Sequence, residues 1–185
     1  MSDDRNFALK MWDSLMDYTG YPFVGDRLPG PKSNEDTVLE VPGYRQTQSY
    51  TCGFVAGLMV LHTFKPKASV DSFWRKVLPR GSDGVSNTGL IKALRKSGIG
   101  VRIVTDLTYA TFAGAVERGF PVITLVKTRE SSTLHWVVVY GVGENPNRIF
   151  VAGNGFPYLS KKVLPWNRFR RLLASEKVAL VCWGK

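Results

Sequence analysis

Hydrophobic positions follow a helical spacing in the first half of the chain and a strand-like spacing in the second. Segments with apolar residues every three or four positions predict helices over 7–16, 52–64, 69–77, 89–96, 108–118 and 165–174. Short runs rich in valine and isoleucine predict strands over 101–104, 121–126, 135–142, 148–152 and 177–183. Because helices precede strands, we expect an α+β fold in which an antiparallel sheet packs on helices.

Turn-forming residues mark the ends of these elements. The residues expected to cap helices at their N-termini are Thr51, Ser69 and either Asn87 or Thr88, and the glycines expected to end helices are Gly98 and Gly119. Residues 1–37 combine a helix with a loop rich in Gly, Pro, Asp and Ser, and we expect this segment to cover the main domain, residues 38–185. The main domain begins with a short extended piece over 38–42, and no linker divides the chain.

Length and composition indicate one globular domain. The chain has 185 residues, 44% of them hydrophobic, and no apolar run approaches the roughly 18 residues of a membrane span. Two cysteines and two histidines are too few for a zinc finger or a disulfide-rich scaffold, so we expect no metal and no cofactor. The N-terminus does not resemble a secretory signal, and few cysteines favour a cytoplasmic location.

The charge is uneven along the chain, which bears on its partners. Residues 1–40 hold eight acidic and four basic residues, while residues 41–185 hold 21 basic and seven acidic ones, a net charge of +14. Such a basic body favours acidic partners. Its densest basic cluster is Lys161, Lys162, Arg168, Arg170 and Arg171, interleaved with Trp166 and Phe169. No nucleic-acid-binding motif accompanies this cluster, so we interpret it as a solvated helix face with buried aromatics, and a nucleic-acid partner as unlikely.

Cys52 is the candidate nucleophile. The predicted helix places it in the first turn, where unpaired backbone N–H groups and the helix dipole favour a thiolate. Gly53 is expected to leave room for a substrate carbonyl to approach the Cys52 amide. A lone cysteine at a helix start is more often a small buried hydrophobe, so a base is needed nearby.

His135 is the candidate base, because it stands at the entrance of an apolar strand, after a loop rich in Ser and Thr. A four-residue hairpin loop over 143–146 would pair position 142 with 147 and place Asn154 directly opposite His135. Asn154 could then accept the proton of one ring nitrogen and aim the other at a thiol. A register shifted by one residue would put Asn154 on the wrong face, unless Gly153 forms a bulge.

The remaining histidine and cysteine serve as controls. His62 lies ten residues after Cys52 on the same predicted helix, about 15 Å along its axis, so it cannot be the base. Cys182 lies between Val181 and Trp183 in the last strand, where burial is expected. One Cys–His pair therefore remains.

These residues resemble the papain-like cysteine peptidases, most closely the branch that processes bacteriocins by cleaving double-glycine leader peptides. The resemblance covers roughly residues 38–156 and rests on four pieces: Val41-Pro42-Gly43-Tyr44-Arg45-Gln46, Cys52-Gly53, the helix from Gly89 to Gly98, and the strand beginning His135-Trp136-Val137-Val138. The branch usually has Asp-Pro at the orienting position, where this chain has Asn154-Gly155.

The resemblance implies a role for each matched residue. Cys52 would be the nucleophile, His135 the general base and then acid, and Asn154 the residue that orients His135. Gln46 would donate its side-chain amide to the oxyanion beside the Cys52 backbone N–H, with Gln48 as the alternative. The expected activity is a cysteine peptidase that cleaves a peptide or isopeptide bond through a thiol acyl-enzyme.

Two other functions stay open from the sequence. The same triad could pass the acyl group to a second nucleophile, as an acyltransferase or amidase does. A non-catalytic basic binding module could also keep the fold. For the peptidase, the expected partner is a peptide or protein substrate, either acidic or with small residues at the cleavage site.

Overall fold

The computed structural model describes residues 34–44, 50–77, 84–127, 134–144, 146–153 and 162–185. The helix predicted over 7–16 lies outside these ranges. The helices predicted in the rest of the first half are present as α2 (Cys52–Phe64), α3 (Val70–Val77) and α4 (Asn87–Lys96). Among the described residues, no helix has both the length and the apolar content that a membrane crossing needs.

The helix ends follow the expected capping chemistry with two corrections. Ser69 accepts a hydrogen bond from the Ser72 amide, and Gly98 and Gly119 adopt positive φ values of 77° and 81°. The cap of α4 is Ser86, whose hydroxyl accepts from the Gly89 amide at 3.1 Å, not Asn87 or Thr88. Thr51 precedes α2 without a side-chain capping bond, because its φ and ψ of −92° and 6° are not the extended values that a cap needs.

The described residues form a seven-stranded antiparallel sheet. Its strands are β1 (Asp36–Val38), β2 (Ile99–Val104), β3 (Val122–Lys127), β4 (Leu134–Gly143), β5 (Arg148–Ala152), β6 (Lys162–Pro165) and β7 (Ala179–Gly184). Their order is β2-β7-β3-β4-β5-β6, and β1 pairs with the far end of β4. The sequence pattern missed β6, a four-residue strand that pairs only with β5 among the described elements.

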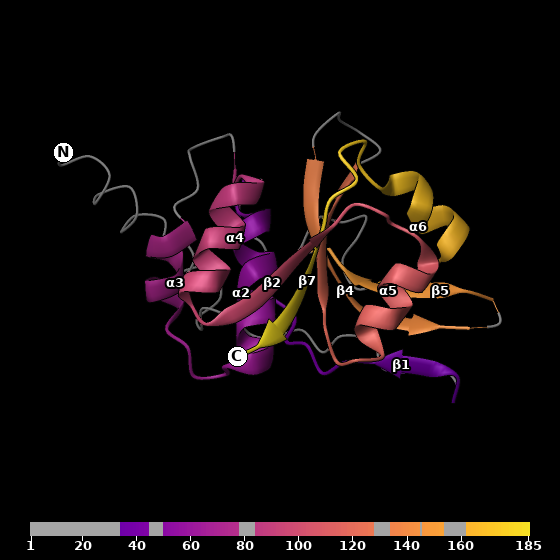
Figure 1. Ribbon diagram of the computed structural model, residues 1–185, viewed down its shortest axis with the longest axis horizontal. Helices are drawn as coiled ribbons and strands as arrows, with labels where there is room; N and C mark the ends of the chain where they lie inside the picture. The colour runs from indigo at the N-terminus through magenta and orange to yellow at the C-terminus, as the bar shows by residue number, and fades with distance from the viewer. Residues whose placement is uncertain (1–33, 45–49, 78–83, 128–133, 145, 154–161) are drawn as a thin grey trace.

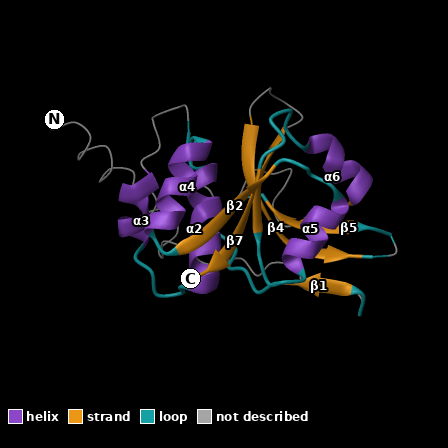
Figure 2. Cartoon of the chain, viewed as in Figure 1, coloured by secondary structure: helices purple, strands orange, loops and turns teal. Residues whose placement is uncertain are grey.

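Helices cover both faces of the sheet, as Figures 1 and 2 show. Helices α2, α3 and α4 lie on one face, where Phe54 and Leu58 pack with Val138 and Leu180. Helices α5 (Tyr109–Val116) and α6 (Trp166–Leu172) lie on the other face, where Phe112 and Phe169 pack with residues such as Val137, Val139 and Val151. The α+β class is therefore confirmed.

The hairpin between β4 and β5 differs from the expected register. Val142 pairs with Ile149 rather than with position 147, because the connection begins one residue later, after Gly143. A β-bulge at Tyr140 then shifts the pairing, so that Val138 faces Ala152. Gly153 was the position where a bulge could have absorbed a shift of one residue, but the extra residue is the buried Tyr140. The predicted pairing of His135 with Asn154 relied on a register that is thus wrong.

Helix α6 explains most of the basic cluster. Phe169 is fully buried and contacts Phe112 edge-to-face, with ring centroids 5.7 Å apart, and Trp166 is half-buried. Arg168, Arg170 and Arg171 are exposed. For these described residues, the interpretation as a solvated helix face with buried aromatics is confirmed.

An ion pair joins β1 to the main sheet. The Asp36 carboxylate is fully buried, and Arg148 in β5 donates to its Oδ1 from both Nε and Nη2 at 2.8 Å. β1 and β5 pair with opposite edges of β4 at the same residues, 141–143, so the ion pair spans this strand. Because the Asp36 side chain is fully shielded from water and that of Arg148 is only 19% exposed, loss of either charge leaves the other uncompensated.

We predict that Asp36→Asn lowers the free energy of unfolding by about 2–3 kcal/mol, since Arg148 keeps only partial solvent access. Asp71→Asn is the matched control, because Asp71 pairs with Arg75 on the exposed surface of α3, where such a pair contributes less than about 1 kcal/mol. Urea unfolding of both variants measures the difference. Equal losses would show that the buried ion pair has no special role.

Candidate active site

Cys52 and His135 lie on two elements that meet. Cys52 is the first residue of α2 and only 6% exposed. Its sulfur interacts with the backbone N–H groups of Trp136, Gly53 and Cys52 itself. Trp136 directly follows His135 in β4, so the start of α2 contacts the start of the strand that carries this histidine.

Packing around Gly53 fixes this junction. A Cβ atom at Gly53 would lie 2.7 Å from Val85 Cβ and 2.9 Å from Trp136 Cδ1. Trp136 is buried, and its indole Nε1 donates to the Val85 carbonyl at 3.1 Å. Only glycine fits between these neighbours. The space that we expected to be open to a substrate carbonyl is therefore filled by Val85 and Trp136.

A backbone carbonyl orients the buried His135 ring. Nε2 donates to the Gly153 carbonyl at 2.8 Å, and the residue is only 3% exposed. A carbonyl can only accept, so Nε2 carries the proton and the lone pair of the neutral ring is on Nδ1. Burial lowers the pKa of His135 below its ordinary 6.5, and the bond to Gly153 opposes this shift in part.

Burial also decides the protonation state of Cys52. Its removal from water raises the pKa of the thiol above the ordinary 9.0 and outweighs the three N–H groups, which lower the pKa. The backbone N–H groups lower the pKa of Cys52, as predicted. Because burial raises this pKa by more, the prediction of a thiolate is wrong. At neutral pH Cys52 is therefore a thiol and His135 a neutral imidazole.

The three other candidate residues, Gln46, Gln48 and Asn154, lie outside the described residues, so their roles stay predictions. The described partner of His135, the Gly153 carbonyl, is a group that sequence reasoning missed. Every residue has a backbone carbonyl, so no side-chain pattern identifies it. The sequence indicated only that the end of the strand over 148–152 would lie near His135, because the two strands form a hairpin.

The control residues have structural roles. Both ring nitrogens of His62 are engaged, Nδ1 with the Tyr44 hydroxyl at 2.5 Å and Nε2 with the Ala68 carbonyl at 2.9 Å. Cys182 is completely buried, its thiol donates to the Leu180 carbonyl at 3.4 Å, and burial raises its pKa. The expected burial of Cys182 is confirmed.

The fold is similar to that of several peptidase domains. The peptidase domain of Streptococcus ComA, a bifunctional ABC transporter involved in quorum sensing, shares 18% identity with a TM-score of 0.61, over 76% of this chain and 96% of that one. A double-glycine motif protease from an AMS/PCAT transporter, solved with its leader peptide, shares 17% identity with a TM-score of 0.60, over 86% and 100%. A putative C39-like peptidase from Bacillus anthracis shares 14% identity with a TM-score of 0.65, over 82% and 99%.

The architecture is thus that of the papain-like cysteine peptidases. The model of the peptidase C39 family matches residues 40–165, and the chain belongs to that family. No curated protein sequence matches the chain. The fold, the enzyme class and the resemblance to bacteriocin-processing peptidases are confirmed by these matches.

We predict that the Cys52 thiol titrates above pH 9.0, since burial raises its pKa. The rate of alkylation by iodoacetamide, followed by intact mass, should rise with pH through this range, whereas Cys182 stays unmodified until the protein unfolds. The 240 nm absorbance of wild type minus Cys52→Ala reports the thiolate directly. A thiolate signal that persists to pH 5 would contradict the neutral pair.

Proposed function

We propose that the protein hydrolyses a peptide bond through a thioester formed at Cys52. The observation that carries this proposal is the contact of the Cys52 sulfur with the Trp136 amide, one residue from a histidine whose Nε2 is held by Gly153. The nucleophile and the base thus come from elements in contact, with the tautomer of the base fixed.

In the acylation step, Nδ1 of His135 takes the thiol proton as the Cys52 sulfur attacks the substrate carbonyl carbon. The carbonyl oxygen becomes an oxyanion, which the Cys52 backbone N–H and the Gln46 side-chain amide would stabilise. The C–N bond then breaks, the imidazolium gives its proton to the leaving amine, and the acyl group remains on sulfur.

In the second step, His135 removes a proton from water, which attacks the thioester and releases the acid while the thiol regains its proton. Asn154 would help to orient the ring. Because the Gly153 carbonyl already accepts the Nε2 proton, we expect Asn154→Ala to lower kcat less than His135→Ala does.

The proposed substrate is a peptide with small residues at the cleavage site. Support comes from the structurally similar double-glycine motif protease, which was solved with a leader peptide. The basic body would also favour an acidic peptide. A cytoplasmic location remains a prediction from the sequence.

An acyltransferase or amidase shares the first step and differs in the nucleophile that resolves the thioester. Incubation of the protein with a peptide donor and a candidate amine, followed by mass spectrometry, separates the two. A joined product in excess over the hydrolysed acid would favour transfer.

We predict that Cys52→Ala abolishes cleavage of a peptide substrate and that His135→Ala lowers kcat by at least about 10²-fold, the range of general acid–base catalysis. Cys182→Ala is the control, since its sulfur lies in the core and its loss costs stability instead. Intact-mass profiling of extracts treated with wild type or Cys52→Ala identifies substrates. If Cys52→Ala still cleaves the substrate, no thioester at Cys52 is involved. If wild-type protein cleaves no peptide, a binding module that keeps the fold is the remaining function.

The pH profile tests the neutral pair independently. His135 acts as a base only when unprotonated, and its pKa is lowered, so the acidic limb of kcat/KM should lie below pH 6.5. The thiol has a raised pKa, so activity should persist to pH 9.0. If kcat/KM already falls as the pH is lowered from 8 to 7, the pKa of His135 is not below its ordinary value.

A further inference from the structure

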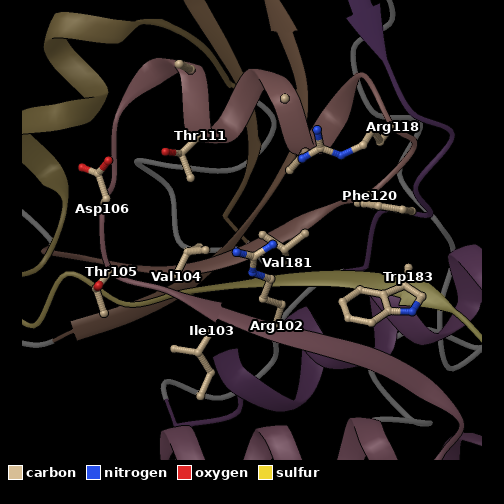
Figure 3. A pocket seen from close by; sticks show the side chains of 13 residues that line it. Arg102, Ile103, Val104, Thr105, Asp106, Thr111, Arg118, Phe120, Val181 and Trp183 are labelled. Carbon is tan, nitrogen blue, oxygen red and sulfur yellow. The ribbon is translucent and has the colours of Figure 1, made fainter.

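A groove lies on the α5 face of the sheet, between β2 and β7 on one side and α5 on the other (Figure 3). Its volume is about 810 Å³, within the range of about 300–1,000 Å³ that sites for small molecules occupy. The groove runs from Asp106, just after β2, to Trp183 in β7. It is therefore large enough to hold a small molecule of several chemical groups.

This groove is separate from the Cys52 site. Cys52 belongs to the core cluster on the α2 face of the sheet, together with Val101 and Cys182. Val181 and Ala115 line the groove and belong to the core cluster on the opposite face. A molecule in the groove would thus not contact the Cys52 sulfur, and its binding does not depend on peptidase activity.

Two guanidinium groups enter the middle of the groove from opposite walls. Arg102 extends from β2 and Arg118 from the turn after α5, and Figure 3 shows both pointing into the same space. Within the described part of the chain, neither forms an ion pair with a carboxylate. The Arg118 guanidinium lies beside Gly114 of α5, where a Cβ would be 3.6 Å from Nη1 and would contact no other residue within 4 Å. The middle of the groove therefore holds two cations with open space beside them.

Two aromatic rings form one end of the groove, beside these cations. The rings of Phe120 and Trp183 have centroids 6.0 Å apart, and both side chains are partly exposed. The indole lies directly over Gly100, where a Cβ would be 2.1 Å from the ring, so its position is fixed by the sheet. A fixed and partly exposed indole is a surface on which a flat ring of a ligand can stack.

The arrangement of these groups indicates the chemistry of the ligand. A phosphate group has three terminal oxygens and can accept hydrogen bonds from two guanidinium groups on opposite sides, whereas a carboxylate offers two oxygens in a single plane. The one acidic lining residue, Asp106, lies at the other end of the groove from Trp183, where its carboxylate repels an anion. The groove therefore suits a molecule that has a flat ring at the Trp183 end and a phosphate in the middle, and a nucleotide combines the two.

We propose that this groove is a nucleotide-binding site. The base stacks on the Trp183 indole, next to Phe120. The phosphate lies between Arg102 and Arg118 and accepts hydrogen bonds from both. Stacking on an aromatic side chain tolerates any base, because every base has an aromatic face, so nucleotides of all four common bases bind.

Calorimetric titration of the wild-type protein measures binding directly. The probes are AMP, GMP, CMP and UMP, with adenosine as the ligand that lacks the phosphate and ribose 5-phosphate as the ligand that lacks the base. We expect adenosine to bind at least about tenfold more weakly than AMP, because it loses the contacts with two guanidinium groups. Ribose 5-phosphate should bind at least about fivefold more weakly, because it loses the stacking. If none of the four nucleotides binds at millimolar concentration, the proposal is wrong.

Two variants separate the contributions of the phosphate and the base. Arg102→Gln/Arg118→Gln should weaken AMP and ribose 5-phosphate at least about tenfold and leave adenosine within about twofold. Trp183→Leu keeps an apolar side chain over Gly100 but removes the stacking surface, so AMP should lose its advantage over ribose 5-phosphate. If either variant weakens all three ligands equally, the two groups do not have the separate roles proposed for them.

Two further variants control for charge and for loss of the fold. Arg170→Gln/Arg171→Gln removes the same charge from the exposed face of α6 and should leave the affinity for AMP within about twofold. Gly114→Leu fills the groove beside Arg118 without removing an arginine, and it should abolish binding while α5 stays folded, because leucine is a better helix former than glycine. Equal losses from the two double-arginine variants would overturn the proposal, because they would show general surface attraction.

Two other ligands compete with a nucleotide for this site, and the same titration distinguishes them. If inorganic phosphate binds as tightly as AMP, the groove is a site for small anions and the nucleotide proposal is wrong. If a polyuridine strand binds at least about tenfold more tightly than UMP, and Arg102→Gln/Arg118→Gln removes that difference, the occupant is single-stranded nucleic acid instead. Binding of AMP that exceeds that of both phosphate and polyuridine supports the nucleotide site.

Discussion

The contact between the start of α2 and the start of β4 is the constraint on which the site depends. Trp136 fills the space beside Gly53 and is tied by its indole N–H to the Val85 carbonyl. Three separate segments thus meet at one buried side chain. The same strand position supplies the backbone amide that reaches the Cys52 sulfur, so the packing of the core also positions the proposed nucleophile.

Burial at this contact has an electrostatic consequence. It disfavours charge on both Cys52 and His135, which raises the pKa of the acid and lowers that of the base. In the described site the proton therefore lies on the Cys52 sulfur rather than on His135. The backbone amides and the Gly153 carbonyl favour the charged forms of Cys52 and His135, so they offset part of this effect of burial.

Much of this arrangement could be predicted from local sequence, and the rest depends on contacts between distant residues. The boundaries of α3, α5 and the central strands follow from apolar spacing and from glycines that need positive φ. The bulge at Tyr140 leaves no such signal, because a buried tyrosine fits a regular strand as well. The hairpin register could therefore not be predicted from the sequence. The same holds for the hydrogen bond from His135 to the Gly153 carbonyl, which depends on that register.

The same limit applies elsewhere. β6 is identified as a strand only by its pairing with β5. The burial of the Asp36 carboxylate is explained only by its ion pair with Arg148, a residue distant in the sequence. The hypothesis of a Cys52–His135 pair followed from there being only two residues of each type, since His62 lies within a helix and Cys182 within a strand. The catalytic roles of Cys52 and His135 remain a proposal. The roles of Gln46 and Asn154 stay predictions.

The position of β7 affects how the protein is made. β7 lies between β2 and β3, and among the described strands it is the only partner of β2. Leu180 and Cys182 also form part of the surface on which α2 rests. During synthesis, residues 52–64 and 134–143 leave the ribosome well before residues 179–184. The support beneath α2 is therefore completed only when residues 179–184 have emerged, which delays assembly of the region around Cys52 until that point.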